Sequence, residues 1–211
     1  MFRLRSILYT IKIIAKMLAD LFLKFEQALT ENNSPILDRM QEGLKPEIVN
    51  TMLSENEVNN ETLVDLYTWK NGNLPDLKEN VIEKLELFPE GIMLSIQDAL
   101  YVYKLYTRVE LSWKAGLFPI FSNGGGNYLL LDILSSSETQ GMILLYDPVP
   151  MASENIVTIY DSANALFTLI VECIAKGAYK YELDGKIDID FYLRNEICSM
   201  LNPHSAYWKD V

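Results

Sequence analysis

The feature that most constrains the fold is a change in sequence texture after Gly116. Four short apolar runs follow, LFPIF, YLLLDIL, GMILLYD and IVTIY, and each is shorter than an ordinary helix. They are separated by SNGGGN, SSSETQ and PVPMASEN, which are mixtures of the residues that favour turns. This pattern predicts a meander of about four antiparallel strands. The runs are almost continuously apolar, which predicts a sheet that is covered on both faces.

Three consecutive glycines, Gly124, Gly125 and Gly126, occupy the first separator. A phosphate-binding P-loop has a lysine after its last glycine and leads into a helix, whose first amides bind the phosphate. The dinucleotide fingerprint also requires a helix at this point. Here no lysine follows, and the next residues, NYLLLD, favour a strand. The glycines therefore predict a hairpin turn, with Gly125 at a positive φ, and a ligand-cradling loop is the alternative.

Helical patterns flank the strand region on both sides. The expected helices cover residues 35–40, 46–53, 59–72, 95–116, 162–177 and 187–201. Their expected caps are Asn59 or Asn60, Ser95 and Ser162, and their expected stops are Gly72, Gly116 and Gly177. The sequence thus predicts an α+β fold with N-terminal helices, a central antiparallel meander sheet of about four to six strands, and C-terminal helices packed on it.

The first 42 residues are expected to form an N-terminal helical appendage, and residues 43–211 the α+β domain. Apolar residues recur at helical spacing from Leu4 to Phe25, while Lys12, Lys16, Asp20 and Lys24 fall on the other face. The lysines interrupt the run that a signal peptide or a spanning helix needs. One amphipathic helix that packs on the body is therefore expected, and binding to a membrane surface through its basic face is the alternative.

The charge of the chain is uneven. Residues 1–45 carry seven basic and five acidic residues, a net charge of +2, whereas residues 46–211 carry eleven and twenty-four, a net charge of −13. A body this acidic repels phosphate backbones, which argues against nucleic acid as a partner. Its long-range field would instead attract a basic protein partner.

Few residues in the chain could carry chemistry. The two cysteines, Cys173 and Cys198, lie in apolar helical patterns, so we expect buried thiols in a reducing cytoplasm, with a disulfide between them as the alternative. His204 is the only histidine, so a zinc cluster is not expected and a Ser-His-Asp triad would have to use it as the base. No nucleophile-elbow motif G-x-S-x-G is present.

Paired carboxylates are the remaining route to an enzyme. Asp132 and Asp147 end two of the expected strands and could form a metal or acid-base pair, although capping of turns explains them more simply. The segment DGKIDID lacks the ligand pattern of a calcium loop and is expected to be a turn. We therefore expect no catalytic residue, no metal, no cofactor and no small-molecule substrate.

Four motifs occur in a fixed order along the chain: LVDLYTWKNG at 63–72, LFPEGIML at 87–94, LFPIFSNGGGNYLLLD at 117–132 and GMILLYD at 141–147. Together they resemble the SUKH superfamily, a domain found in yeast cell-wall (glucan) synthesis regulators and in bacterial toxin-immunity proteins. The resemblance covers residues 43–176. It implies an α+β fold without catalysis, in which a groove or a sheet face binds another protein. In bacteria that partner is typically a toxin domain, often a nuclease.

The candidate partner-binding residues are aromatic, polar and acidic. Aromatic residues carry much of the binding energy at protein interfaces, and acidic residues would complement a basic toxin. The candidates are Trp69, Asn71, Trp113, Phe121, Asn123, Tyr128, Glu83 and Glu86, with Glu79 and Glu90 as further acidic residues. The alternatives are that Trp69 and Phe121 belong to the core and that Asn71 only ends a helix in left-handed geometry.

Three functions compete on these observations. The first is a cytoplasmic immunity protein that docks on a basic toxin domain. The second is a regulatory scaffold related to the glucan synthesis regulators, which the basic N-terminal helix would suit. The third is a metal-dependent enzyme that uses Asp132 and Asp147.

Overall fold

A computed structural model describes residues 2–74, 82–89, 91–109, 113–148 and 156–209, with the side chains of the first helix described from Met17 onward. The helices are α1 (Phe2–Glu31), α2 (Pro46–Ser54), α3 (Glu61–Trp69), α4 (Ile96–Val109), α5 (Ala163–Ala175) and α6 (Phe191–Leu201). Three short 3-10 helices are η1 (Leu37–Arg39), η2 (Ile82–Lys84) and η3 (Tyr207–Lys209). The strands are β1 (Met40–Glu42), β2 (Lys70–Asn73), β3 (Ile92–Met93), β4 (Leu117–Ser122), β5 (Tyr128–Asp132), β6 (Ile143–Tyr146), β7 (Ile156–Tyr160), β8 (Tyr179–Tyr181) and β9 (Ile187–Ile189).

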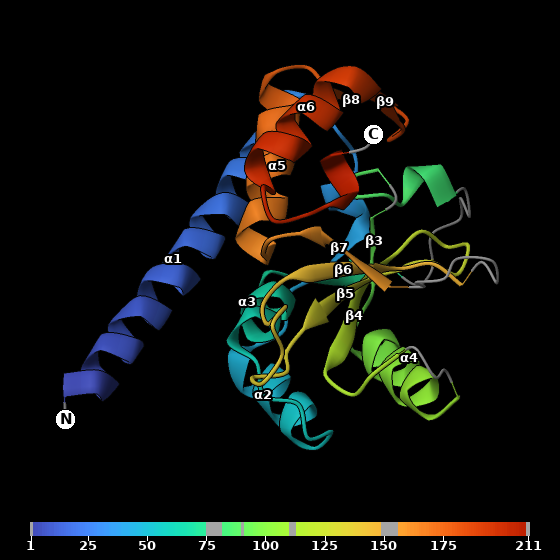
Figure 1. The fold of residues 1–211 in the computed structure, drawn as a ribbon. Coiled ribbons are helices and arrows are strands. Elements are labelled where there is room, and N and C mark those ends of the chain that lie inside the picture. The colour runs from blue at the N-terminus through green and yellow to red at the C-terminus, as the bar shows by residue number, and fades with distance from the viewer. Residues whose placement is uncertain (1, 75–81, 90, 110–112, 149–155, 210–211) are drawn as a thin grey trace.

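The centre of the fold is a five-stranded antiparallel sheet in the order β3-β4-β5-β6-β7 (Figure 1). Its last four strands are the predicted meander, and β3 adds one more strand at the edge of β4. Two small antiparallel pairs of strands, β1-β2 and the β8-β9 hairpin, lie outside this sheet. The helices come before and after the meander in the chain, so the predicted α+β class is confirmed.

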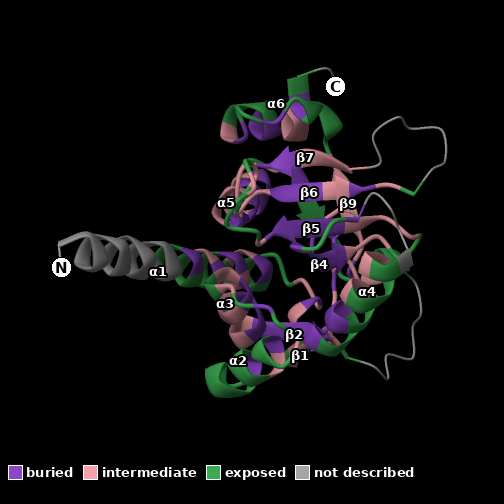
Figure 2. Cartoon of the chain, turned by 60° about the horizontal axis from the view of Figure 1, so that its bottom comes forward, coloured by how far each residue is buried: buried purple, intermediate pink, exposed green. Residues whose placement is uncertain are grey.

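Helices cover both faces of the sheet (Figures 1 and 2). On one face α1, α3 and α5 enclose the main core, which includes Phe121 and Leu129 from the sheet. On the other face α4 lies over a smaller aromatic core of Trp113, Leu130 and Tyr146. Because both faces are buried, the strands can be apolar along almost their whole length, as the sequence predicted.

The second half of α1 is part of the main core. Leu18, Phe22, Phe25 and Leu29 are all buried there, one helical turn apart, and the Phe22 ring stacks on Trp69 of α3 with centroids 4.3 Å apart. The segment expected to be an appendage therefore shares its core with residues 43–211. Among the residues that the structure describes, none of the helices combines the length and the apolar character that crossing a bilayer requires.

The predicted helix caps are present. The side chains of Asn60 and Ser162 accept the N–H of the residue three positions later, at 3.1 and 3.0 Å, and begin α3 and α5. Ser95 accepts the N–H of Asp98 at 3.1 Å and donates its hydroxyl to the Asp98 carboxylate at 2.6 Å, which fixes the start of α4. Gly177 follows α5 with φ at +76°, the left-handed geometry expected of a helix stop.

Several predicted helix boundaries are wrong. In three cases a short strand, β1, β2 or β9, contains residues that were expected to be helical. Of the expected helix at 35–40, only the short 3-10 helix η1 forms, and Met40 already belongs to β1; the expected final helix begins only at Phe191, since Ile187–Ile189 is a strand. Gly72 does not end α3, which stops at Trp69, but lies in β2. Helix α4 ends at Val109, well before Gly116. The β1–β2 pair depends on residues that are distant in the chain, such as Met40 and Asn73, which local patterns do not reveal.

The triple glycine forms the predicted β4–β5 hairpin turn. Asn123 organises it, because its Oδ1 accepts the N–H groups of Gly125 and Asn127 at 2.8 and 3.0 Å. Positive φ angles occur at Gly124 (+72°) and Gly126 (+107°), whereas Gly125 lies outside the left-handed region. The prediction of a positive φ at Gly125 is therefore wrong, since the Asn123 side chain turns the chain on either side of it.

We expect Gly124→Ala to lower the free energy of unfolding by about 1–2 kcal/mol, because an alanine is strained at positive φ. Gly125→Ala provides the matched control and should change it by less than about 0.5 kcal/mol. Urea unfolding of the three proteins measures both values. Equal losses at the two positions would contradict this assignment of the turn geometry.

Candidate functional site

Three of the predicted partner-binding aromatics lie in the two cores. Trp69 packs between Phe22 and Phe167 and donates its Nε1–H to Glu26 at 2.9 Å. Trp113 is 2% exposed and donates its Nε1–H to the carbonyl of Leu117 at 2.7 Å. Phe121 is fully buried against Phe88, with ring centroids 5.0 Å apart. All three side chains hold the fold together; Trp113 and Phe121 are buried, and Trp69 is partly exposed.

Asn71 has a structural role that the sequence did not indicate. It is buried in β2, where its Oδ1 accepts the N–H of Ile96 at 3.0 Å, in the first turn of α4. Its φ is not positive, so the interpretation as a left-handed helix end is wrong. Asn71 joins the end of the α3–β2 unit to the helix that covers the second face of the sheet.

The remaining predicted residues, Glu83, Glu86, Asn123 and Tyr128, are partly or fully exposed at one end of the sheet. Ile82, which is 46% exposed, lies against Gly124, so η2 sits beside the glycine turn. We call Ile82, Glu83, Glu86, Asn123 and Tyr128 the hairpin-end surface. Glu79 and Glu90 lie outside the described residues.

Tyr128 connects this surface to the aromatic core under α4. Its ring lies 5.6 Å from both Tyr106 and Trp113, measured between centroids, in edge-to-face arrangements. Burial, and then the neighbouring Tyr106, raises the pKa of Tyr128, so the hydroxyl stays neutral and able to donate a hydrogen bond at physiological pH. The surface thus includes an aromatic residue that the packing under α4 holds in place.

Ion pairs and backbone contacts tie η2 to the turn of the β8–β9 hairpin. Glu83 pairs with Lys186 at 2.9 Å, and Lys84 pairs with Asp184 at 3.8 Å. Arg39 donates to the carbonyls of Lys84 and Asp184 at 2.8 and 2.9 Å. Exposed ion pairs contribute little stability individually, but together these contacts fix the position of η2 and therefore of the acidic side chains on it.

The carboxylate proposed for metal chemistry, Asp132, closes a turn. It is 2% exposed, and it accepts the N–H of Leu134 at 3.0 Å and the hydroxyl of Thr139 at 2.6 Å. Both bonds organise the β5–β6 connection. Within the described ranges, no group of three or more histidine, cysteine, aspartate or glutamate side chains is placed to hold a metal ion.

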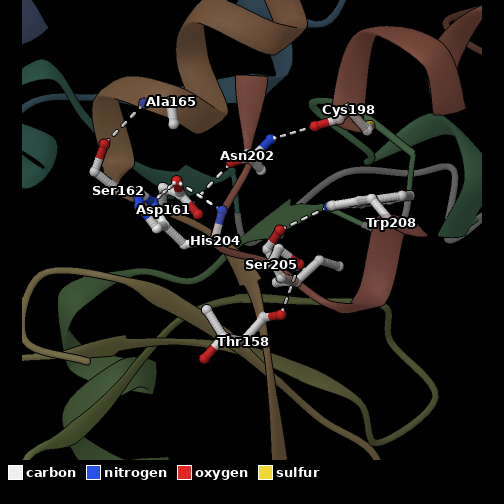
Figure 3. Close-up of polar contacts among 10 residues, drawn as sticks. Thr158, Asp161, Ser162, Ala165, Cys198, Asn202, His204, Ser205 and Trp208 are labelled. Atoms are coloured by element: carbon white, nitrogen blue, oxygen red, sulfur yellow. Dashed lines mark hydrogen bonds and ion pairs between the residues drawn. The ribbon is translucent and has the colours of Figure 1, made fainter. Parts of the chain in front are cut away.

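The sequence did not reveal the contact between His204 and Asp161 (Figure 3). The His204 Nδ1 lies 2.6 Å from the Asp161 Oδ2, and most of the ring is exposed. The two nearby serines are engaged elsewhere: Ser162 accepts the N–H of Ala165, and Ser205 donates to the carbonyl of Thr158 at 2.9 Å. Neither hydroxyl bonds to the imidazole, so the pair does not form the triad considered from the sequence.

Two more hydrogen bonds hold the C-terminal segment against β7, which is an edge strand of the sheet. Trp208 donates its Nε1–H to the carbonyl of Ile159 at 2.7 Å, and Asn202 Oδ1 accepts the N–H of Asp161 at 3.0 Å (Figure 3). An uncovered edge strand invites pairing with other chains. The polar cluster around His204 therefore has a clear structural purpose.

The two cysteines are free and buried, as expected. Burial raises the pKa of the Cys173 thiol to about 11 and that of Cys198 to about 12. Both therefore remain protonated at physiological pH and are poor nucleophiles. These thiols belong to the packing between α5 and α6.

The chain matches no model of a known protein family and no curated protein. The hairpin-end surface is therefore assigned from its geometry and charge.

Proposed function

We propose that this protein is a non-enzymatic binding module of the SUKH kind, an immunity protein that blocks a basic bacterial toxin domain such as a nuclease. The observation that carries the proposal is the hairpin-end surface, where an exposed acidic residue, Glu83, is held on η2 next to the glycine turn, and a partly buried tyrosine, Tyr128, follows that turn in β5. Rigid aromatic residues and complementary charge are what a specific protein interface uses.

Charge supports the same proposal. The net charge of −13 over residues 46–211 would speed the approach of a basic partner and would repel nucleic acid. The module could therefore cover the active site of a nuclease without itself binding the nucleic-acid substrate. The order of the four motifs that resemble SUKH domains also fits. They fall on α3–β2, on β3 with the residues before it, on the β4–β5 hairpin and on β6.

A charge reversal tests the proposed surface. We expect Glu83→Lys to weaken binding of the partner by about tenfold or more and to slow association, because it places a like charge against a basic surface. Glu172→Lys on α5 is a matched control, since Glu172 is a partly exposed acid that is also paired with a lysine, Lys176, at 3.4 Å. Surface plasmon resonance with the captured partner measures both effects. Similar losses for the two variants would mean that only the net charge matters and that the hairpin-end surface is wrongly assigned.

The alternative is a regulatory scaffold related to glucan or cell-wall synthesis regulators, and the basic face of α1 favours it. Deletion of residues 1–30 cannot test it, because the deletion also removes Phe22, Phe25 and Leu29 from the core. The double substitution of Lys12 and Lys16 by glutamate leaves that core intact. Flotation of the full chain with anionic vesicles, lost in the double variant, would favour the scaffold over the immunity protein.

A further inference from the structure

A cavity of about 350 Å³ lies where α1, α3, the β5–β6 connection and the amino end of α5 meet. These three helices come together on the face of the sheet opposite α4 (Figure 2). The described residues that line the cavity are Leu18, Thr62, Asp65, Gly141, Ser162, Ala163 and Asn164. This cavity is not part of the hairpin-end surface.

One acceptor group on the lining of this cavity has no partner in the described part of the chain, and a second lies closed off from solvent in the same wall. Asp65 is half-buried and makes neither a hydrogen bond nor an ion pair there. The Oδ1 of Asn164 is buried and accepts no hydrogen bond. A buried polar group normally has a partner, because leaving it unpaired is costly. The unpaired Asp65 carboxylate therefore has room for a donor that is supplied from outside.

The state of Asp65 agrees with this interpretation. Burial, and then the charge of Glu61 one helical turn away, raises the pKa of Asp65 to about 6. The carboxylate is therefore ionised at physiological pH but lacks the counter-charge that would lower its pKa. An incoming cation would supply that counter-charge.

The cavity walls suit a long basic side chain. Leu18 and Ala163 are apolar residues of the lining that can contact a methylene stem, while the Asp65 carboxylate can accept from its charged end. The amino end of α5 opposes a cation with a partial charge of about +0.5. The partial positive charge of the helix end is smaller than the combined negative charge of Asp65 and Glu61. Asp161 before α5 adds further negative charge and is paired with His204.

We propose that this cavity receives a lysine or arginine side chain of the protein partner. This proposal rests on the proposed function and adds a second contact to it, one that selects a single basic residue by shape. The acidic body would attract the partner as a whole, and the cavity would fix its register by pairing one of its cations with Asp65.

The test uses the full-length chain and a small probe. We expect Nα-acetyl-lysine methylamide to shift the amide NMR signals of Thr62, Asp65, Ala163 and Asn164 at pH 8, with a Kd on the order of 10 mM. The matched norleucine derivative, which has the stem without the ammonium, should bind at least about fivefold more weakly. The matching arginine derivative tests the alternative basic side chain.

Two variants identify the group responsible. Asp65→Asn should weaken lysine-probe binding by at least about fivefold, whereas Glu61→Gln, on the same helix but not lining the cavity, should change it less than about twofold. At pH 5 the native protein should bind the probe about tenfold more weakly than at pH 8, because a carboxyl with a pKa of about 6 is then mostly protonated.

The unpaired carboxylate should also affect stability. Its pKa is raised in the folded state, so its ionisation opposes folding, and the cost grows as pH rises from about 4 to about 6. We expect Asp65→Asn to raise the melting temperature by about 2–4 °C at pH 8 and to leave it unchanged at pH 4. A lower melting temperature at pH 8 would mean that Asp65 already has a stabilising partner.

The remaining outcomes are also decisive. Equal binding of the lysine and norleucine probes, unchanged binding by Asp65→Asn, or no binding of either basic probe at about 50 mM would overturn the cavity assignment. The cavity and the proposed function can fail separately. Probe binding without any protein partner would leave the cavity and remove the immunity role, whereas a partner that binds Asp65→Asn normally would do the reverse.

Discussion

Phe167→Ala is expected to lower the free energy of unfolding by about 3–5 kcal/mol. Phe167 is 1% exposed on α5, and its ring meets the edges or faces of Phe22, Phe25 and Trp69 at centroid distances of 4.8, 6.2 and 5.5 Å. These four aromatic rings join α1, α3 and α5. Truncation would leave a cavity that three helices, each fixed by other contacts, cannot easily close.

Phe191→Ala is the control for this prediction. Phe191 lies on α6 and is 57% exposed, with the Arg194 guanidinium 5.2 Å from its ring centroid. Its loss should cost no more than about 1 kcal/mol. Chemical denaturation of both variants gives the comparison. If Phe167→Ala cost no more than Phe191→Ala, α1 would not be packed on the body as described.

Gly72→Ala is expected to cost about 3–4 kcal/mol, from two sources. Gly72 has a φ of +79°, where an alanine is strained by about 1–2 kcal/mol. A Cβ built on it would also lie 2.5 Å from the backbone nitrogen of Ser95, so β2 and the start of α4 would have to move apart. The neighbouring bond from Ile96 to Asn71 would be strained by the same movement.

Gly141 separates the two contributions. Its φ is +80°, almost that of Gly72, but nothing lies within 4 Å of a Cβ built on it. Gly141→Ala should therefore cost only the conformational part, about 1–2 kcal/mol. The difference between the two variants, measured by urea unfolding, gives the cost of the close approach. Equal values would mean that the β2–α4 contact yields easily.

The close approach at Gly72 also helps to explain the motif at residues 63–72. Leu63 and Leu66 face the core, Trp69 fills the space between α1 and α5, and Asn71 with Gly72 holds the start of α4. The motif thus has a structural role at each of these positions. Its aromatic and polar residues were predicted to bind a partner because a sequence does not distinguish a buried tryptophan from an exposed one.

The predictions that were confirmed depend on local chemistry. The meander follows from runs that are too short to be helices, and the caps at Asn60, Ser95 and Ser162 follow from side chains that bond to amides three residues away. The hairpin turn at Asn123 and the glycines is equally local. Each of these features is decided within about six residues of sequence.

The features that were missed depend on long-range contacts. Strand β1 pairs with β2 about thirty residues later, and Asp161 meets His204 across 43 positions. Asp65 was indistinguishable from an ordinary residue on the polar face of a helix, because its half-burial arises only when α1 and α5 pack beside α3. Of the predicted binding residues, Glu83 is exposed, Glu86, Asn123 and Tyr128 are partly exposed, and Trp113 and Phe121 are buried; their role in binding stays a prediction.

The most direct test of the central claim, that this chain acts by binding a basic protein, is to mix it with the purified product of the neighbouring gene. Light scattering should give the mass of a stoichiometric complex, and the partner's activity should be blocked. The complex should weaken as salt rises and on Glu83→Lys, but not on Glu172→Lys. No complex with that product, together with no stoichiometric protein partner captured from the native cell, would contradict the claim.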